Sequence, residues 1–478
     1  MIVRILPLTP VVALISGCMV VGTDYTSPDT ITPDSWHQSL SSDLHSGSSS
    51  LEKWWTRFND PTLNRLIDTA RGSNRDLAIA YERINEARAS RGIARSQLFP
   101  TIDFGGGVSR GRTSQNLGTP SPPAGKTGDF WSTGLDAGWE IDFFGGVRRS
   151  IEASNATVEG TEELYRDTMV SLLAEVAYAY IQIRTLDERI RLAENNIKNQ
   201  RDSVGLTQDR FDAGLAPELD VSQATTNLAS TEAFVPALRN QRDVALNRLA
   251  TLIGRYPGAA SSFIGSSKGI PVPPRSAGTG IPSDLVRSRP DIRAAERSLA
   301  AQTALIGVAE ADLFPRFTLS GTFQLQSTAA SSLTESNSRN YSFGPSFRWN
   351  IFSAGRIKNQ IAIEESRTKQ AYLNYESTVL KAVEEVENAL SSVRNERDRL
   401  GALNTAVTAS EKTVSLVKDN YGEGLIDFQN VLDAERTIFA NEDERAVSQG
   451  QIAAAYVALF KSLGGGTRMR SAKSGTKD

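Results

Sequence analysis

The sequence contains the same structural unit twice, and this duplication limits the possible folds more than any other feature. Each copy predicts a short helix, two alternating strands around a polar loop, a very long helix, a tight turn and a return helix. The landmarks recur at a nearly constant offset: Phe99 and Phe314 (314 − 99 = 215), Trp139 and Trp349 (349 − 139 = 210), Gly214 and Gly424 (424 − 214 = 210), Gly254 and Gly464 (464 − 254 = 210). We therefore expect two similar halves of one elongated structure.

Each half contains two segments in which apolar and polar residues alternate. In the clearest one, Trp131, Leu135 and Trp139 fall on one face, and Ser132 and Asp136 fall on the other. A period of two residues indicates strands with one apolar and one polar face. The sequence predicts strands at about 99–110, 130–144, 315–327 and 340–352.

These strands have the character of membrane-spanning strands. A soluble, half-buried hairpin would also alternate, but three further features favour a membrane. The strands reach the roughly 9–11 residues that span an outer membrane, aromatic residues stand at their ends, and the joining loops at 111–129 and 328–340 are long and polar. No internal run reaches the roughly 18 apolar residues of a spanning helix. If this protein crosses a membrane, the strands must cross it.

Two very long helices follow the strand pairs. Residues 149–210 and 357–419 carry apolar residues at three-and-four spacing, the pattern of coiled-coil packing. At about 1.5 Å per residue each helix would be on the order of 90 Å long. Return helices are predicted at 218–253 and 427–463, after turns that contain Gly214 and Gly424.

The number of strands predicts the oligomeric state. Four strands cannot close a barrel, and open edges would leave backbone groups unpaired in lipid. Two copies supply eight strands, which enclose little more than side chains, whereas three copies supply twelve and enclose a lumen. The polar face needs water; its charged and amide residues are Asp136, Glu140, Asp142, Arg348 and Asn350. We predict an α+β membrane protein whose four strands per chain join a 12-stranded trimeric β-barrel, continued by a long α-helical barrel.

The N-terminus predicts export and lipid attachment. Residues 1–17 resemble a bacterial lipoprotein signal peptide, and Cys18, the one cysteine in the sequence, stands at the cleavage site for acylation. The alternative is an ordinary signal peptide with an incidental cysteine. The resulting domain plan is a tether at 18–60, repeat 1 at 61–254 with a first helix at 61–98, a linker at 255–284, repeat 2 at 285–463 and a disordered tail at 464–478.

Composition excludes several kinds of chemistry. The 52 basic and 55 acidic residues give a net charge of −3, so nothing points to nucleic acid. One cysteine and two histidines are too few for a metal cluster or a Cys/His nucleophile. We therefore predict no enzyme, no metal site and no cofactor.

Several short motifs, in this order along a duplicated chain, resemble a known family. They are Val21-Gly22-Thr23-Asp24-Tyr25 after Cys18, Trp54-Trp55, Phe58-Asn59-Asp60-Pro61, Arg289-Pro290-Asp291 and Val431-Leu432-Asp433-Ala434. The set resembles the TolC-like outer-membrane factors of tripartite efflux systems, especially the NodT-type lipoproteins. The resemblance implies a passive homotrimeric channel in the bacterial outer membrane. It would dock a periplasmic adaptor and an inner-membrane pump, often of the resistance-nodulation-division type, and export small molecules such as drugs.

The resemblance also implies a closed periplasmic end near the two glycine turns. Asp220 and Tyr421 match positions of an interhelix link in this family. A second link, which uses an arginine, falls on Ile426 with its partner on Leu219, so a hydrophobic contact is expected in its place. The ring of acids at the aperture falls on Asn430 and Asp433; only Asp433 keeps the charge.

A second interpretation is a periplasmic coiled-coil adaptor or scaffold. Adaptors also have long helical hairpins, but the two wide strand pairs with polar and aromatic faces do not suit that class.

Overall fold

The computed structural model describes residues 20–29, 32–39, 44–45, 51–112, 114–116, 126–265, 269–274 and 277–466. The chain divides into two compact units, each described by itself below. The sheet unit comprises Met1–Asp29, Arg83–Thr161 and Ala294–Tyr375. The helical unit comprises Thr30–Glu82, Glu162–Arg293 and Glu376–Asp478.

The sheet unit contains one four-stranded antiparallel sheet in the order β2-β3-β5-β6. Its strands are β2 (Thr101–Arg112), β3 (Thr127–Ile141), β5 (Arg316–Ser327) and β6 (Arg339–Arg348), with the short helices η3 (Ala330–Ser332) and η4 (Ser336–Ser338) between the last two. β3 of the first repeat pairs with β5 of the second, from Trp131 opposite Ser327 to Ile141 opposite Phe317. The predicted four long strands are therefore confirmed, and they form a single sheet.

The strand β6 ends earlier than the sequence predicts. It stops at Arg348 instead of continuing to about 352. The indole Nε1 of the next residue, Trp349, donates a hydrogen bond to the carbonyl of Leu313 at 3.0 Å. Trp139 makes the same contact in the first repeat, to the carbonyl of Leu98 at 2.9 Å. These two indoles tie the strands to the ends of the preceding helices.

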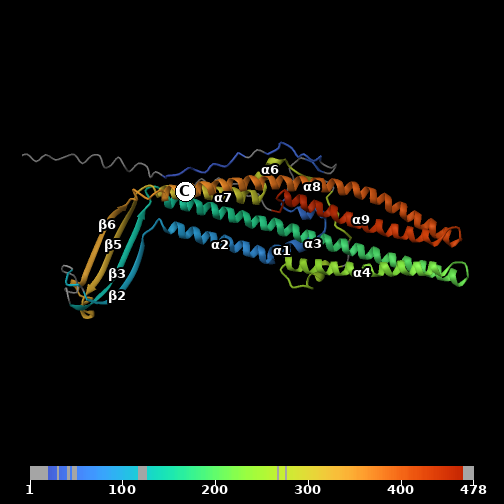
Figure 1. The fold of residues 1–478 in the computed structure, drawn as a ribbon, viewed down its shortest axis with the longest axis horizontal. Helices are drawn as coiled ribbons and strands as arrows, with labels where there is room; N and C mark the ends of the chain where they lie inside the picture. Colours follow the sequence, from blue (N-terminus) through green and yellow to red (C-terminus); the bar gives the residue numbers. More distant parts are fainter. Residues whose placement is uncertain are drawn as a thin grey trace, which may run out of the picture. The chain divides into compact units, whose positions relative to one another are not determined.

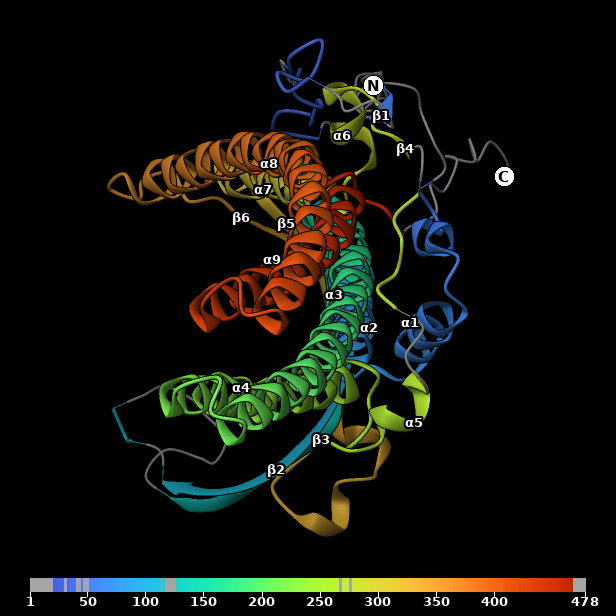
Figure 2. The same cartoon turned by 90° about the vertical axis from the view of Figure 1, so that its right-hand side faces the viewer.

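Four helices in two hairpins dominate the helical unit. Hairpin 1 consists of α3 (Gly146–Asp212) and α4 (Glu218–Leu252), and hairpin 2 of α8 (Arg356–Gly422) and α9 (Phe428–Ser462); α3 and α8 begin in the sheet unit. At 67 residues, α3 and α8 are each about 100 Å long. Both turns lie at the same end (Figure 1), which faces the viewer in Figure 2. Among the described residues, no helix is both long and apolar enough to cross a membrane.

The first predicted helix, at 61–98, is wrong as one piece. The structure has α1 (Pro61–Ser73) and α2 (Arg75–Ser96), separated by Asn74 in an extended conformation. The Asn74 side chain accepts a hydrogen bond from the N–H of Leu77 at 2.9 Å and donates one to the carbonyl of Leu252 at 3.0 Å. Asparagine therefore caps a new helix here and ties it to the end of α4.

The predicted tether and linker also contribute structure. The helix η2 (Trp54–Phe58) buries Trp54, which stacks on Phe460 with 5.4 Å between the ring centroids. Burial of such a large aromatic side chain stabilises the fold. The linker holds α5 (Ala260–Ile264) and β4 (Ala277–Gly278), which pairs with β1 (Leu44–His45), and the next helices are α6 (Pro282–Ser288) and α7 (Pro290–Ala311).

Residues 464–466 belong to the ordered structure, and the rest of the predicted tail, 467–478, lies outside the described residues. The N–H of Gly465 donates to the carbonyl of Phe460, and the N–H of Gly466 donates to the carbonyl of Leu51, both at 2.9 Å. Residues 464–466 therefore close the end of α9 against the segment before η2.

Candidate functional site

The two faces of the sheet differ sharply in chemistry. On one face, Phe104, Phe323, Tyr341 and Phe343 point outward and are between 48% and 84% exposed. The opposite face carries small and polar residues, among them Gly105, Ser132, Gly134, Asp136, Glu140, Thr318, Ser320, Thr322 and Ser342. An exposed apolar face of this kind needs a cover of lipid or protein.

The structure sorts the residues predicted to line a lumen. Asp136 and Glu140 lie in β3 on the polar face, where Asp136 accepts a hydrogen bond from Gln324 at 3.3 Å. Arg348 lies opposite Arg316 on the same face. Asn350 follows the end of β6.

Asp142 does not belong to this lining, and its assignment to the polar face is wrong. Its carboxylate lies after the end of β3 and accepts the N–H groups of Val147 and Arg148 at 3.1 and 3.0 Å. It satisfies the unpaired amides at the start of α3, so its position is set by helix capping.

The turns of the two hairpins have the same backbone geometry. Gly214 and Gly424 adopt φ values of 74° and 79°, which favour glycine. The N–H of Leu215 returns to the carbonyl of Arg210, and the N–H of Leu425 returns to that of Asn420. Both helices thus end in the same motif. The divergence of the sequence after each glycine changes the side chains and not the turn.

The structure brings Tyr421 and Asp220 together. The Tyr421 hydroxyl at the end of α8 donates a hydrogen bond to Asp220 in the first turn of α4, at 3.0 Å. Burial and this carboxylate acceptor raise the pKa of Tyr421 to about 12, so the phenol is a neutral donor at neutral pH. The link joins hairpin 2 to hairpin 1.

An apolar cluster surrounds the tyrosine ring. Its members come from α4, α8 and α9: Ala224, Tyr421, Phe428, Val431 and Leu432. Ile426 packs against this cluster, whereas Leu219 remains 61% exposed. The hydrophobic contact expected in place of a polar lock therefore stays a prediction.

Asn430 and Asp433 lie on the exposed side of α9. The side-chain amide of Asn430 donates to the carbonyl of Asp427 at 3.2 Å, and Asp433 accepts a hydrogen bond from Gln429 at 2.9 Å. Their spacing of three residues places them on one helix face. Their polar groups are available to solvent there.

Sequence reasoning missed Arg210 at this site. Its guanidinium lies over the Tyr421 ring, 4.9 Å from the centroid, and its Nη1 donates to the carbonyl of Gly422 at 2.7 Å. A cation in the last turn of α3 also interacts favourably with the carbonyl end of the helix. The sequence signal was a basic residue in the last turn, but its partner lies more than 200 residues away.

Cys18 lies outside the described residues. The segment that follows it is held in the sheet unit. The N–H of Val21 donates to the carbonyl of Phe144 at 3.1 Å, and the buried Arg149 donates to the carbonyls of Val21 and Gly22 and to the Asp24 carboxylate. The start of α3 therefore fixes the residues just after the predicted lipid site.

Comparison with known proteins agrees with the duplicated architecture. A family described as "Outer membrane efflux protein" matches residues 66–255 and 281–465, once in each repeat. Nodulation protein T of Rhizobium leguminosarum bv. trifolii is 30% identical over 457 residues, 95% of each chain. The pyoverdine export outer membrane protein OpmQ of Pseudomonas aeruginosa is 30% identical over 462 residues, 95% of this chain and 96% of OpmQ.

The fold is also that of a solved channel. The structure of the outer-membrane channel OprN superimposes with a TM-score of 0.87 at 37% identity, covering 93% of this chain and 99% of OprN. Sequence, fold and the two matched repeats lead to the same assignment. The chain therefore belongs to the outer membrane efflux protein family, and it is an outer-membrane efflux channel.

Proposed function

We propose that three copies of the chain form one passive conduit for efflux, with a 12-stranded barrel and a helical tube of four helices per copy. The observation that carries this proposal is the two-sided sheet. In the described part of the chain, β2 and β6 each pair with a strand on one side only. Open edges are unfavourable in lipid, and three such sheets close a barrel wide enough for a polar lumen.

The apolar face of this barrel would contact outer-membrane lipid, and the polar face would line the lumen. Export against a concentration gradient through a passive lumen needs an external energy source. We propose that an inner-membrane pump of the resistance-nodulation-division type, coupled through a periplasmic adaptor, supplies it. The chain itself would then catalyse no reaction.

The turns of the hairpins would form the periplasmic gate. Asp220 and Tyr421 join the hairpins by a hydrogen bond, and Arg210 packs on the same ring. Asn430, Asp433 and the exposed Leu219 would line the aperture, with Ile426 as part of the apolar support. One acidic group per copy at Asp433 would give the aperture a modest preference for cations.

The cargo is a small molecule that the pump selects. OpmQ is named for pyoverdine export. In this chain, the polar sheet face offers mainly small hydroxyl, amide and glycine positions. A lining of this kind carries little shape selectivity, so toxic compounds or drugs of varied structure fit it equally well.

The decisive experiment is reconstitution of the purified full chain in planar bilayers. We expect a trimer by native mass measurement, a small resting conductance and recovery from the outer-membrane fraction. A monomer without conductance that leaves the membrane after mild extraction would overturn the proposal and favour a periplasmic adaptor or scaffold.

Cys18→Ser should abolish acyl labelling of the mature chain. The hydroxyl cannot form the thioether to lipid, and the sequence has no other cysteine. Metabolic labelling with a fatty acid measures this directly, with the unchanged chain as control. Trimer assembly should persist because strand pairing does not use the lipid. Continued labelling of the variant would remove Cys18 as the attachment site.

A further inference from the structure

A buried carboxylate joins all four helices close to the turns. The Glu435 side chain on α9 accepts a hydrogen bond from Ser203 of α3 at 2.6 Å and lies 2.9 Å from the Lys418 ammonium of α8. Its other oxygen accepts a longer hydrogen bond, 3.4 Å, from Asn227 of α4. Arg436 donates to the Asn227 carbonyl oxygen at 3.2 Å, which fixes the orientation of that amide. We call Glu435, Ser203, Asn227 and Lys418 the carboxylate hub.

The hub is a buried charge with a specific set of partners. Glu435 is 3% exposed, and Ser203 and Asn227 are each 5% exposed. A carboxylate this deeply buried is tolerated because it is paired and hydrogen-bonded, and it becomes unfavourable when a partner is withdrawn. Separation of the helices would therefore expose or orphan this charge.

The hub occurs in only one of the two equivalent places that the repeat offers. The offset between the repeats is 424 − 214 = 210 residues. The equivalent positions in the other repeat are neutral and exposed: Thr225, Gln208, Thr413 and Thr437. The repeat therefore does not dictate this buried ion pair, because the equivalent positions carry no charged residue.

The hub lies directly beyond the apolar cluster on the side away from the turns. Val431 and Leu432 of the cluster precede Glu435 on α9 by about one helical turn, and Lys418 precedes Tyr421 on α8 by three residues. The tyrosine link, the apolar cluster and the hub are therefore three successive contacts along one interface between the hairpins.

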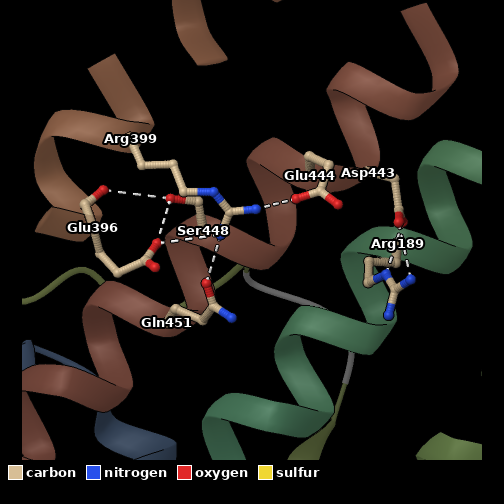
Figure 3. Close-up of polar contacts among 7 residues, drawn as sticks. All are labelled: Arg189, Glu396, Arg399, Asp443, Glu444, Ser448 and Gln451. Carbon is tan, nitrogen blue, oxygen red and sulfur yellow. Dashed lines mark hydrogen bonds and ion pairs between the residues drawn. The ribbon is translucent and has the colours of Figure 1, made fainter. Parts of the chain in front are cut away.

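Contacts between hairpins and within a hairpin respond differently to opening. Figure 3 shows both kinds: Arg189 of α3 pairs with Asp443 of α9, whereas Arg399 of α8 pairs with Glu444 of α9. A hairpin that moves as one body keeps the second kind intact. The movement of such a hairpin must break or shift the contacts between hairpins. Through Ser203 and Asn227, the hub belongs to the first kind.

We propose that Glu435 is a second closing contact of the aperture, which holds the two hairpins of one protomer together and separates when the channel opens. This inference rests on the proposed function as a gated conduit. In this proposal the buried charge stabilises the closed state, in addition to the contacts at the turns. Glu435 acts as a positioning residue, since it lies behind the turns and touches no cargo.

The test measures the resting conductance of reconstituted full-length trimers. Glu435→Gln keeps the shape of the side chain but removes the charge that accepts the hydrogen bonds of Ser203 and Asn227 from hairpin 1. We expect a rise of about tenfold, because a hydrogen bond to a charged group is worth at least about a tenfold change in an equilibrium. Ser203→Ala removes the donor that reaches Glu435 from hairpin 1 and should produce a similar rise. Lys418→Met removes a pair within hairpin 2 and should remain near the unchanged chain.

Glu444→Gln is the matched control. It also removes a glutamate charge that faces a basic residue of α8, but within one hairpin and at an exposed position. We expect no change in resting conductance. A purely packing role for the hub would lower the thermal midpoint of the trimer and leave the conductance of Glu435→Gln and Ser203→Ala unchanged, and that result would overturn the inference.

The outcomes separate this inference from the proposed function. If the unchanged chain forms no conducting trimer, the conduit itself is refuted. If Tyr421→Phe raises the conductance and the hub variants do not, only the hub is refuted. Should Glu435→Gln fail to assemble, the contrast between Ser203→Ala and Lys418→Met decides.

Discussion

Tyr421→Phe should raise the resting conductance of the reconstituted trimer at least about tenfold. The substitution removes only the hydroxyl that donates to Asp220 at 3.0 Å, and the ring can keep its place in the apolar cluster. A hydrogen bond to a charged acceptor is worth about 1.5–3 kcal/mol, which corresponds to a factor of at least about ten in the ratio of closed to open states. Three copies per channel would add to this effect.

Asp220→Ala should act in the same direction. Alanine removes the acceptor, whereas asparagine could still accept the hydrogen bond and is therefore the weaker test. Two matched controls exist: Glu218→Ala removes a neighbouring acidic residue from the same helix turn, and Tyr256→Phe removes a hydroxyl from a tyrosine that is 89% exposed. Neither control should alter the conductance. Unchanged conductance in both Tyr421→Phe and Asp220→Ala would end the assignment of the link as a gate.

The sequence predicts most of the elements that depend on periodicity. Strand alternation and helical spacing follow from which side chains face a common surface, and these patterns are local. The ends of elements are less predictable, because single contacts decide them. Asn74 starts a new helix through its own capping bonds, and β6 stops at Arg348, before the end that alternation predicts.

The candidate site shows the same division. The pairing of Tyr421 with Asp220 follows from a family resemblance, since both residues match known positions. Arg210 carries only the signal of a basic residue in a last helical turn, and no local pattern indicates the partners of Arg210 or Glu435, which lie on other helices up to 232 residues away. Buried charges of this type become recognisable only once the helices are packed against one another.

The repeat suggests that Gly254 and Gly464 have the same surroundings, and the structure shows that they do not. Both residues follow a return helix, with φ of 66° and 75°, and the sequence gives no reason to separate them. A Cβ added at Gly464 would stand 3.3 Å from the Cα of Arg289, a tight contact. A Cβ added at Gly254 would stand 2.1 Å from the Ser73 carbonyl oxygen, closer than two non-bonded atoms can approach.

Gly254→Ala should therefore be far more damaging than Gly464→Ala. Both variants pay about 1–2 kcal/mol for a left-handed backbone with a side chain. Gly254→Ala must in addition displace the backbone at the end of α1, where the Ser73 hydroxyl donates to the carbonyl of Ile253 at 2.7 Å. That backbone also positions the cap at Asn74, so the displacement spreads into α2. We expect Gly464→Ala to assemble with a slightly lowered thermal midpoint and Gly254→Ala to lose most of its folded trimer, measured as heat-resistant oligomer in the outer-membrane fraction. Equal losses in the two variants would mean that the segment around Ser73 yields, and that the two halves of the repeat are equivalent in packing as well as in sequence.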